Sequence, residues 1–143
     1  MYHCNRVRDE DIQGKSWSES ERYFPVKDGY AIDDGRADAA RHCIWLGGMT
    51  ARGSESLARA AANIHEFTSP ARPDDPEYSK ASEAMDRYNN ETGIRIGHES
   101  DGDFAEVINK CVTASRSANK IPQEEVADVQ NPGGHSLIFF NGK

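Results

Sequence analysis

In four stretches of the chain, hydrophobic residues recur at the three- and four-residue spacing of an amphipathic helix. We expect helices from residues 34–38 to about residue 52, from residue 54 to the segment NIHEF, near residues 76–91 and near residues 103–118. Acidic residues at the start of the first stretch suit the positive end of a helix dipole. The pattern predicts a mainly α fold, a small single-domain helical bundle.

Polar segments without clear periodicity flank the helical core, residues 34–118. Residues 1–33 are expected to form an irregular arm that packs rings such as Trp17 onto the domain. Residues 119–143 are expected to form a C-terminal extension, and its short apolar tail, HSLIFFNGK, is either a lone strand or a docked plug. The proline-rich segment TSPARPDDPEYSK predicts a loop between the second and third helices.

Glycines interrupt two of the expected helices. Each glycine inside a helix costs about 1 kcal/mol relative to alanine, so Gly47 and Gly48 require a compensating reason. We expect another helix to approach closely there. Gly93 follows the two asparagines of the third helix and is expected to end that helix as a C-cap.

Composition limits both the core and the partners of the chain. A hydrophobic fraction of 36% and a mean hydropathy of −0.79 over 143 residues predict a small core and a polar surface. The net charge of −7 and the pI near 5.2 disfavour broad electrostatic capture of nucleic acid. A nuclease that holds phosphate through a metal ion stays allowed.

The sequence shows no signal for membrane insertion, for classical secretion or for a disulfide framework. The chain has no apolar run near the length of a transmembrane helix, and its start, MYHCNRVRDEDIQGK, lacks the apolar core of a secretory signal peptide. Export would therefore need other machinery. The cysteines Cys4, Cys43 and Cys111 are odd in number, widely spaced and form no CxxC motif, so reduced thiols are expected rather than a disulfide or a cysteine zinc site.

The first three expected helices carry polar residues that a simple amphipathic helix does not need. These residues are Asp38, Arg41, His42, His65, Glu66, Asp86, Asn89 and Asn90. If the helices converge, imidazole and carboxylate groups would suit a divalent metal ion such as Zn, Mn or Mg, and a bound water would become a nucleophile near neutral pH. We expect His42, His65 and Asp86 to hold the ion, which makes residues 34–118 the expected catalytic core.

The remaining polar residues receive roles around that ion. Glu66 would be the general base or an extra ligand, and Arg41 would neutralise charge that develops on phosphate oxygens. Asn89, Asn90 and Asp38 would orient the substrate or the water.

Structural roles are an alternative for the same side chains. The ring of His42 would bond to Asp38 or to a carbonyl group, and His65 would be a surface residue at a helix C-terminus. Asp86 would pair with Arg87 or Arg95. Adjacent asparagines late in a helix resist such an interpretation, because they are poor helix formers unless a specific network holds them.

The segments ADAARHCIW, NIHE and AMDRYNNETGIRIG resemble an uncharacterised bacterial domain family over about residues 34–118. Members show a D-A-F-R-H-A-x-W helix, an A-H-E helix end and an M-D-x-x-N-N-x-x-G-x-x-I-G segment. The matching positions here are Asp38, Arg41, His42, Trp45, His65, Glu66, Met85, Asp86, Asn89, Asn90, Gly93 and Gly97. Departures are Ala40 for an aromatic residue, Asn63 for an acid and Tyr88 for a second histidine, and the last puts one ligand or acid in doubt.

Members of that family are often the C-terminal tips of polymorphic toxins that are secreted or delivered by contact. The resemblance implies an antibacterial toxin or effector that reaches the periplasm or cytoplasm of a target cell on a secretion-system carrier. It also implies a cognate immunity protein in the producing cell. A looser similarity to HD-type phosphohydrolases lies in the order of His42, His65-Glu66 and Asp86, with Glu in place of Asp and shorter spacing.

Three functions stay open from the sequence. The first is metal-assisted hydrolysis of a phosphoester or phosphoanhydride, in an envelope lipid or, less favoured, in nucleic acid. The second is a metal-free peptidoglycan or lipid hydrolase that uses Glu66 as general acid with Asp86 as its partner. The third is a non-enzymatic adaptor or immunity-type binding module whose polar cluster is structural.

Overall fold

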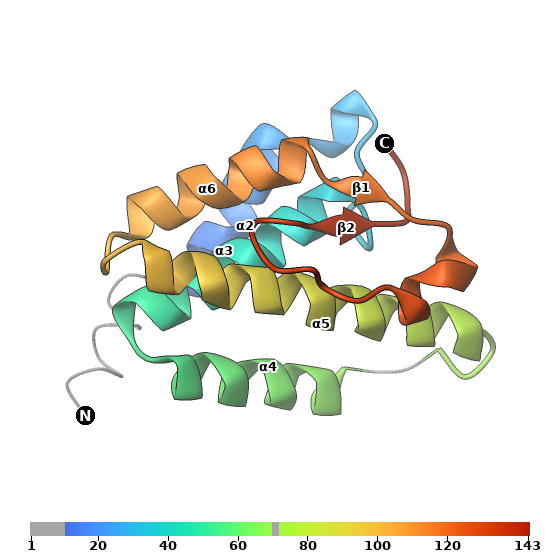
Figure 1. Cartoon of the computed structure of the whole chain (residues 1–143). Coiled ribbons are helices and arrows are strands. Elements are labelled where there is room, and N and C mark those ends of the chain that lie inside the picture. Colours follow the sequence, from blue (N-terminus) through green and yellow to red (C-terminus); the bar gives the residue numbers. More distant parts are fainter. Residues whose placement is uncertain (1–10, 70–71) are drawn as a thin grey trace.

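The computed structural model describes residues 11–69 and 72–143. Among these, the α-helices are α2 (Ile12–Tyr23), α3 (Arg36–Arg52), α4 (Glu55–Thr68), α5 (Pro76–Glu99) and α6 (Phe104–Arg116). The chain also has short 3-10 helices at Val26–Asp28 and Gln123–Asp128, and strands β1 (Asn119–Lys120) and β2 (Ile138–Phe139), which pair in parallel (Figure 1). The predicted mainly α, single-domain fold is confirmed.

Helix α3 runs through the middle of the molecule, and α2, α4, α5 and α6 all pack against it (Figure 1). Gly47 allows this close packing: a Cβ there would lie 2.7 Å from Cγ1 of Val107 on α6 and 2.9 Å from the carbonyl oxygen of Gly93 on α5. A Cβ on Gly48 would lie 2.6 Å from Cγ2 of Ile12. The close approach predicted from the glycine pair is therefore confirmed.

Helix α2 corrects the prediction of an irregular arm, although residues 1–10 lie outside the described part of the chain. Its buried residues Ile12, Ser16 and Ser20 are four apart and face the domain. Both serine hydroxyls donate to backbone carbonyl groups three residues earlier, which lets polar side chains be buried. The helical period was hidden because serines occupy two of its buried positions.

Helix α5 continues past the end predicted near residue 91, so the prediction that Gly93 is a C-cap is wrong. A Cβ on Gly93 would lie 2.7 Å from the carbonyl oxygen of Cys43 and 3.0 Å from its Cα. The glycine is explained by contact between two helix backbones rather than by a helix end.

The C-terminal tail packs in the core with the helices. Leu137–Phe140 are buried, and the side-chain amide of Asn89 on α5 bonds to both backbone groups of Ile138, at 2.9 and 3.0 Å. The tail is thus a docked strand, and residues 119–143 contribute to the same core as residues 34–118 rather than extending from it.

A buried disulfide joins Cys43 of α3 to Cys111 of α6, whose Cα atoms are 5.7 Å apart. The prediction of reduced thiols is wrong for this pair, and Cys4 lies outside the described residues. The two cysteines are 68 residues apart in sequence, and only the close packing of α3 on α6 brings them together. Cysteine spacing alone does not contain that information.

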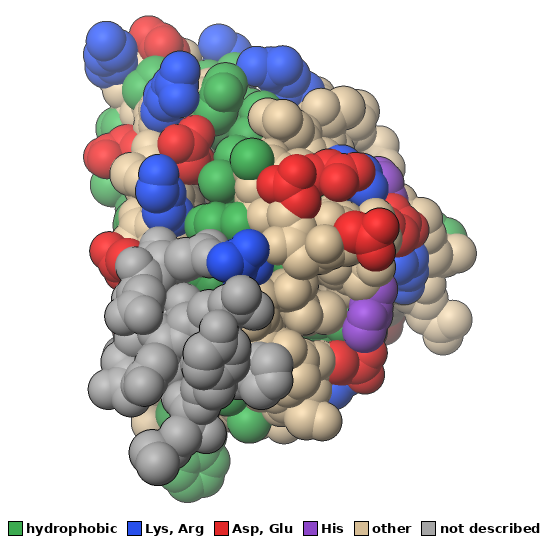
Figure 2. All heavy atoms as spheres, turned by 90° about the vertical axis from the view of Figure 1, so that its left-hand side faces the viewer, with side chains coloured by type: hydrophobic (Ala, Val, Ile, Leu, Met, Phe, Trp, Pro, Cys, Tyr) green, Lys and Arg blue, Asp and Glu red, His purple; other side chains and the backbone are tan. Residues whose placement is uncertain are grey.

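The face shown in Figure 2 interleaves acidic and basic side chains and gathers no broad basic area in that view. In the part of the chain that the structure describes, no helix is both long enough and apolar enough to cross a bilayer.

Candidate functional site

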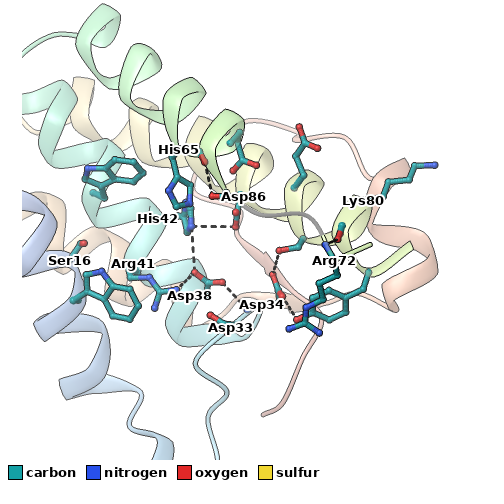
Figure 3. A pocket seen from close by; sticks show the side chains of 18 of the residues that line it. Ser16, Asp33, Asp34, Asp38, Arg41, His42, His65, Arg72, Lys80 and Asp86 are labelled. Atoms are coloured by element: carbon teal, nitrogen blue, oxygen red, sulfur yellow. Dashed lines mark hydrogen bonds and ion pairs between the residues drawn. The ribbon is translucent and has the colours of Figure 1, made fainter. Parts of the chain in front are cut away.

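A pocket of about 840 Å³ lies where α2, α3, α4 and the first turns of α5 meet (Figure 3). Six of the predicted site residues line it: Asp38, Arg41, His42, His65, Glu66 and Asp86. The proline-rich segment after α4 forms part of the rim through Arg72 and Pro73. The expected convergence of the three helices at one hollow is therefore present.

The first turns of α3 supply Asp38, Arg41 and His42. The carboxylate of Asp38 accepts a hydrogen bond from the backbone N–H of Asp34 at 2.8 Å and pairs with the guanidinium of Arg41. That guanidinium also lies over the ring of Trp17 on α2, 3.8 Å from its centroid. Arg41 is thus held between a carboxylate and an aromatic face at the edge of the pocket.

The imidazole of His42 is buried and has a defined orientation. Its Nδ1 lies 2.9 Å from Oδ1 of Asn90, and because that oxygen only accepts, Nδ1 must carry the proton. Nε2 then faces the pocket, 3.5 Å from Asp38 and 3.3 Å from Asp86. With the proton at Nδ1, Nε2 is the ring nitrogen that can bind a metal ion.

His65 and Glu66 come from the last turns of α4. The ring of His65 lies 5.6 Å from the ring centroid of His42 and 5.6 Å from that of Trp45. Burial, and then the nearby His42, lowers the pKa of His65. This favours the neutral ring and so a second nitrogen ligand.

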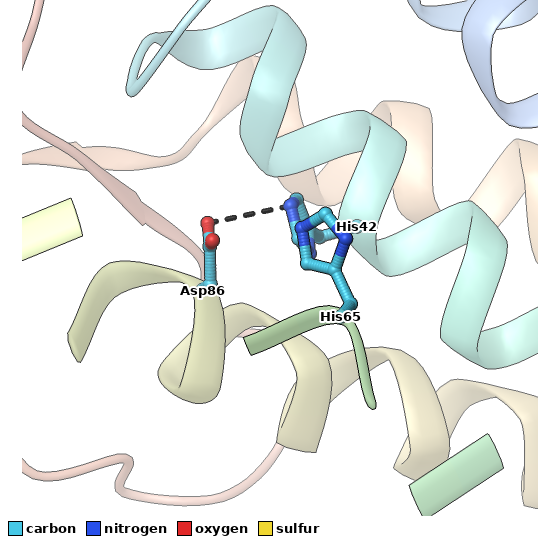
Figure 4. Close-up of side chains that lie close together, drawn as sticks. All are labelled: His42, His65 and Asp86. Atoms are coloured by element: carbon cyan, nitrogen blue, oxygen red, sulfur yellow. Dashed lines mark ion pairs between the residues drawn. The ribbon is translucent and has the colours of Figure 1, made fainter. Parts of the chain in front are cut away.

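Asp86 of α5 faces both histidines (Figure 4). Burial, followed by the charges of Asp38, Glu66 and Asp34, raises the pKa of Asp86 to about 10, and its carboxyl shares a hydrogen bond with Glu66. Within the described residues, Oδ1 of Asp86 and Oε1 of Glu66 are buried and accept no hydrogen bond, although Oδ1 of Asp86 lies 3.3 Å from Nε2 of His42. Buried carboxyl oxygens without partners are costly, and a cation among them would remove the cost.

The positions of His42, His65 and Asp86 would allow them to hold a metal ion. One ligand atom from each lies within 4.8 Å of the others, so a modest adjustment brings all three to bonding distance of one centre. Two nitrogens and a carboxylate oxygen suit Zn or Mn, and three protein ligands leave a position for water.

The structure assigns different roles to the two asparagines. The prediction that Asn89 orients substrate is wrong, because its amide is consumed by the backbone of Ile138 in the core. Asn90 does not line the pocket either, but it acts on the site by holding His42. The expected network around the pair exists, with one asparagine serving the fold and the other the site.

Other structural alternatives find no support at Asp86. Arg87 pairs with Glu83, and Arg95 donates to Gly134, so neither neutralises Asp86. Tyr88, which replaces a histidine of the resembling family, donates to or accepts from Ser136 and does not line the pocket. That departure therefore leaves the cluster intact.

Sequence reasoning missed Asp34. It is buried, has a φ of 60°, and its carboxylate accepts hydrogen bonds from Tyr78 and Ser82 at the start of α5. Burial raises the pKa of Asp34 above its usual range. Asp33 and Asp34, immediately before α3, were interpreted only as a helix start. The available signal was that two adjacent acids are more than a helix start needs.

Residues 7–120 match the model of a protein family described as a domain of unknown function (DUF6973). The match covers most of the chain, which therefore belongs to this family. No curated protein and no solved structure matches it. Because the family description names no activity, function has to be inferred from the geometry of the pocket.

Proposed function

We propose that this member of the DUF6973 family is a metal-assisted hydrolase that cleaves a phosphoester or phosphoanhydride. The observation that carries the proposal is the convergence of His42, His65 and Asp86, in which two imidazoles come together with a buried carboxyl group whose Oδ1 accepts no hydrogen bond. A divalent ion there would lower the pKa of a bound water and supply the nucleophile. Zn, Mn and Mg are the candidate ions.

The surrounding side chains suit the other steps of hydrolysis. Glu66 hydrogen-bonds to Asp86 and has a free buried oxygen, so it is placed to accept a proton from a water beside the ligands. Arg41 at the pocket edge, with Arg72 and Lys80 across it, offers positive charge to phosphate oxygens (Figure 3). Asp38 holds Arg41 and faces His42, which makes it a positioning residue.

We further propose that the domain is an antibacterial toxin or effector acting on envelope lipid phosphates, with nucleic acid the less favoured substrate. The net charge of −7 supports this order, since acidic surfaces repel nucleic acid. The buried Cys43–Cys111 disulfide supports action outside the reducing cytoplasm, because disulfides persist in oxidising compartments.

Such a toxin requires a secretion-system carrier and a cognate immunity protein. We expect the immunity protein to occlude the pocket around Arg41, His65 and the segment at Arg72, and to present basic patches that complement the acidic chain. Co-purification of the domain with proteins of the producing cell tests this, and harmless expression with no such inhibitor contradicts the toxin proposal.

A metal-free hydrolase is the second candidate, and one observation favours it. The carboxyls of Glu66 and Asp86 share a hydrogen bond, which requires a proton between them and resembles the acid and base pair of glycoside cleavage. The raised pKa of Asp86 would place that proton on Asp86 rather than on Glu66, the general acid expected from sequence.

A chelator experiment separates the candidates. The purified domain is assayed on chromogenic phosphomonoester and phosphodiester substrates and on peptidoglycan, before and after chelation and after adding back Zn, Mn or Mg. Phosphoester turnover that is lost in chelator and restored by one ion supports the metal-assisted hydrolase. Peptidoglycan turnover that is indifferent to chelator supports the second candidate.

A pair of matched variants tests whether the cluster is catalytic at all. Glu66→Gln should abolish turnover, whereas Glu83→Gln, which changes an exposed carboxylate of the same pocket rim paired to Arg87, should not. If folded Glu66→Gln and Asp86→Asn proteins keep every wild-type effect in a susceptible host, catalysis at this cluster is ruled out and the adaptor or immunity-type binding module stands.

A further inference from the structure

A second set of ligand atoms adjoins the first. One carboxylate oxygen from each of Asp34, Asp38 and Asp86 lies within 4.8 Å of the others, and all three residues are buried. Asp86 belongs to both sets, so the two sets are adjacent and share one carboxyl group. Figure 3 shows the chain of acids running from Asp86 past His42 to Asp38 and Asp34.

Hydrogen bonds hold Asp34 and Asp38 in place but do not use up their acceptor capacity. Tyr78 and Ser82 donate to the two oxygens of Asp34, and a backbone N–H and Arg41 donate to those of Asp38. Each carboxylate oxygen has two lone pairs, so one such donor leaves an acceptor position. Outer hydrogen bonds of this kind normally orient metal-ligating carboxylates.

Asp86 supplies the independent indication of a ligand. Its side chain is aimed into the cluster, the residue is only 9% exposed, and its Oδ1 lies 3.3 Å from Nε2 of His42 but accepts no hydrogen bond among the described residues. Arg41 pairs with Asp38 alone, and the His42 ring faces Asp38 and Asp86, so the three buried acids would still repel one another without further cations. Their buried arrangement is therefore explained by positive charge bound between them.

The charge of the pocket indicates how many cations fit a phosphate substrate. Six carboxyl groups and three basic side chains line the pocket, and Arg87 outside it pairs with Glu83, so with every carboxyl ionised and neutral histidines the net charge of these groups is −2. One divalent ion would bring this charge to zero, which does not attract an anionic phosphate. Two divalent ions would bring it to +2, which attracts one.

We infer that the pocket binds a second divalent cation through Asp34, Asp38 and Asp86, with the Asp86 carboxylate bridging the two ions. This inference rests on the proposed function, since the first ion is the one held by His42, His65 and Asp86. The second site is all oxygen and suits Mg or Mn, whereas the first suits Zn or Mn. Paired ions in such sites lie roughly 3.5–4 Å apart and stabilise both the attacking and the leaving oxygen of a phosphoester.

The test uses Mn²⁺ as the probe on the full chain freed of metal. Calorimetric titration should give two Mn²⁺ ions per chain, and electron paramagnetic resonance of the loaded protein should show two spin-coupled ions. Asp34→Asn should bind one Mn²⁺ with no coupling, and the variant should fold because asparagine also tolerates a positive φ. His65→Ala should likewise lose one ion, and the rim variant Glu83→Gln should keep both.

The outcomes separate this inference from the proposed function. A single uncoupled Mn²⁺ in the wild type, or two coupled ions retained in Asp34→Asn, would overturn the second site. If one ion binds and chelation still abolishes phosphoester turnover, the proposed function survives with a mononuclear site. If no Mn²⁺ binds and turnover is indifferent to chelator, both fail.

Discussion

Neighbouring residues of α3 face two regions of opposite character. Cys43 points into a buried interface, where glycines bring the backbones of α3 and α5 into contact and a disulfide joins α3 to α6. His42 points into the pocket, where carboxyl oxygens are buried without partners. The first region stabilises the fold and the second destabilises it, so the rigid interface holds together side chains that would otherwise separate.

The largest expected effect comes from neutralising Asp86, which lies among the other acids of the pocket. Asp86→Asn removes a metal ligand with little change of shape, so phosphoester turnover should fall by at least about 1,000-fold, equivalent to roughly 4 kcal/mol of transition-state stabilisation. Steady-state kinetics with the restoring ion measure it. A variant within threefold of wild type would contradict the assignment of Asp86.

Asp86 also predicts how stability depends on pH in metal-free protein. The folded pKa of about 10 lies above the ordinary value of 3.8, so the folded state binds the proton more tightly than the unfolded state. This group should therefore lower the free energy of unfolding as pH rises from about 4 towards 10, with a plateau outside that window. Denaturant unfolding at several pH values should show a flatter profile for Asp86→Asn, and an unchanged slope would contradict the burial of this charge.

In the interface around Cys43, the disulfide should make the next largest contribution, here to the free energy of unfolding. Replacing both Cys43 and Cys111 by serine should lower the free energy of unfolding by about 2–5 kcal/mol. Urea denaturation of the oxidised wild type and of the double variant measures the difference. Equal midpoints would show that the disulfide does not support the scaffold.

Close helix packing predicts a loss of similar or smaller size. Gly93→Ala places a methyl group against the backbone of Cys43, so α3 and α5 must separate, at a cost of about 1–3 kcal/mol. Gly133→Ala is a control without a clash, because a Cβ there meets no atom within 4 Å, although its φ of 96° adds strain of its own. A Gly93→Ala protein as stable as wild type would contradict the backbone contact.

A last variant, with an effect of similar size, tests how the interface around Cys43 and the pocket are connected. Asn90→Ala frees the His42 ring without removing a ligand, so metal affinity should fall by about 10- to 100-fold. Titration with the restoring ion measures the affinity, and saturating metal should recover most of the turnover. Loss of turnover that excess metal does not rescue would contradict a positioning role.

Hydrophobic periodicity was sufficient to predict the helices whose buried positions are apolar. Helices α4 and α6 begin within a residue or two of their predicted starts, because Ser54 and Asp103 cap them and apolar stripes follow. Helix α2 was missed because serines occupy buried positions, and the end of α5 because a glycine in helix packing looks like a glycine at a helix end.

The candidate site could be predicted as far as residue type and helix face indicate chemistry. His42, His65, Glu66 and Asp86 do share one pocket, as expected from polar residues that amphipathic helices do not need. The hydrogen-bond partners around the site could not be predicted from the sequence. Asn89 and Asn90 are adjacent residues of one type, and only the direction of each amide on α5 decides that one bonds to Ile138 and the other to His42. Contacts across 48 or 49 residues depend on how the helices pack, which periodicity does not specify.

Anomalous diffraction from crystals grown with Mn²⁺ would locate bound ions directly, without reference to any substrate. The account predicts a strong peak within bonding distance of His42 Nε2, His65 and Asp86. Anomalous peaks for Mn²⁺ elsewhere on the surface, with none among these three side chains, would contradict a metal centre in this fold.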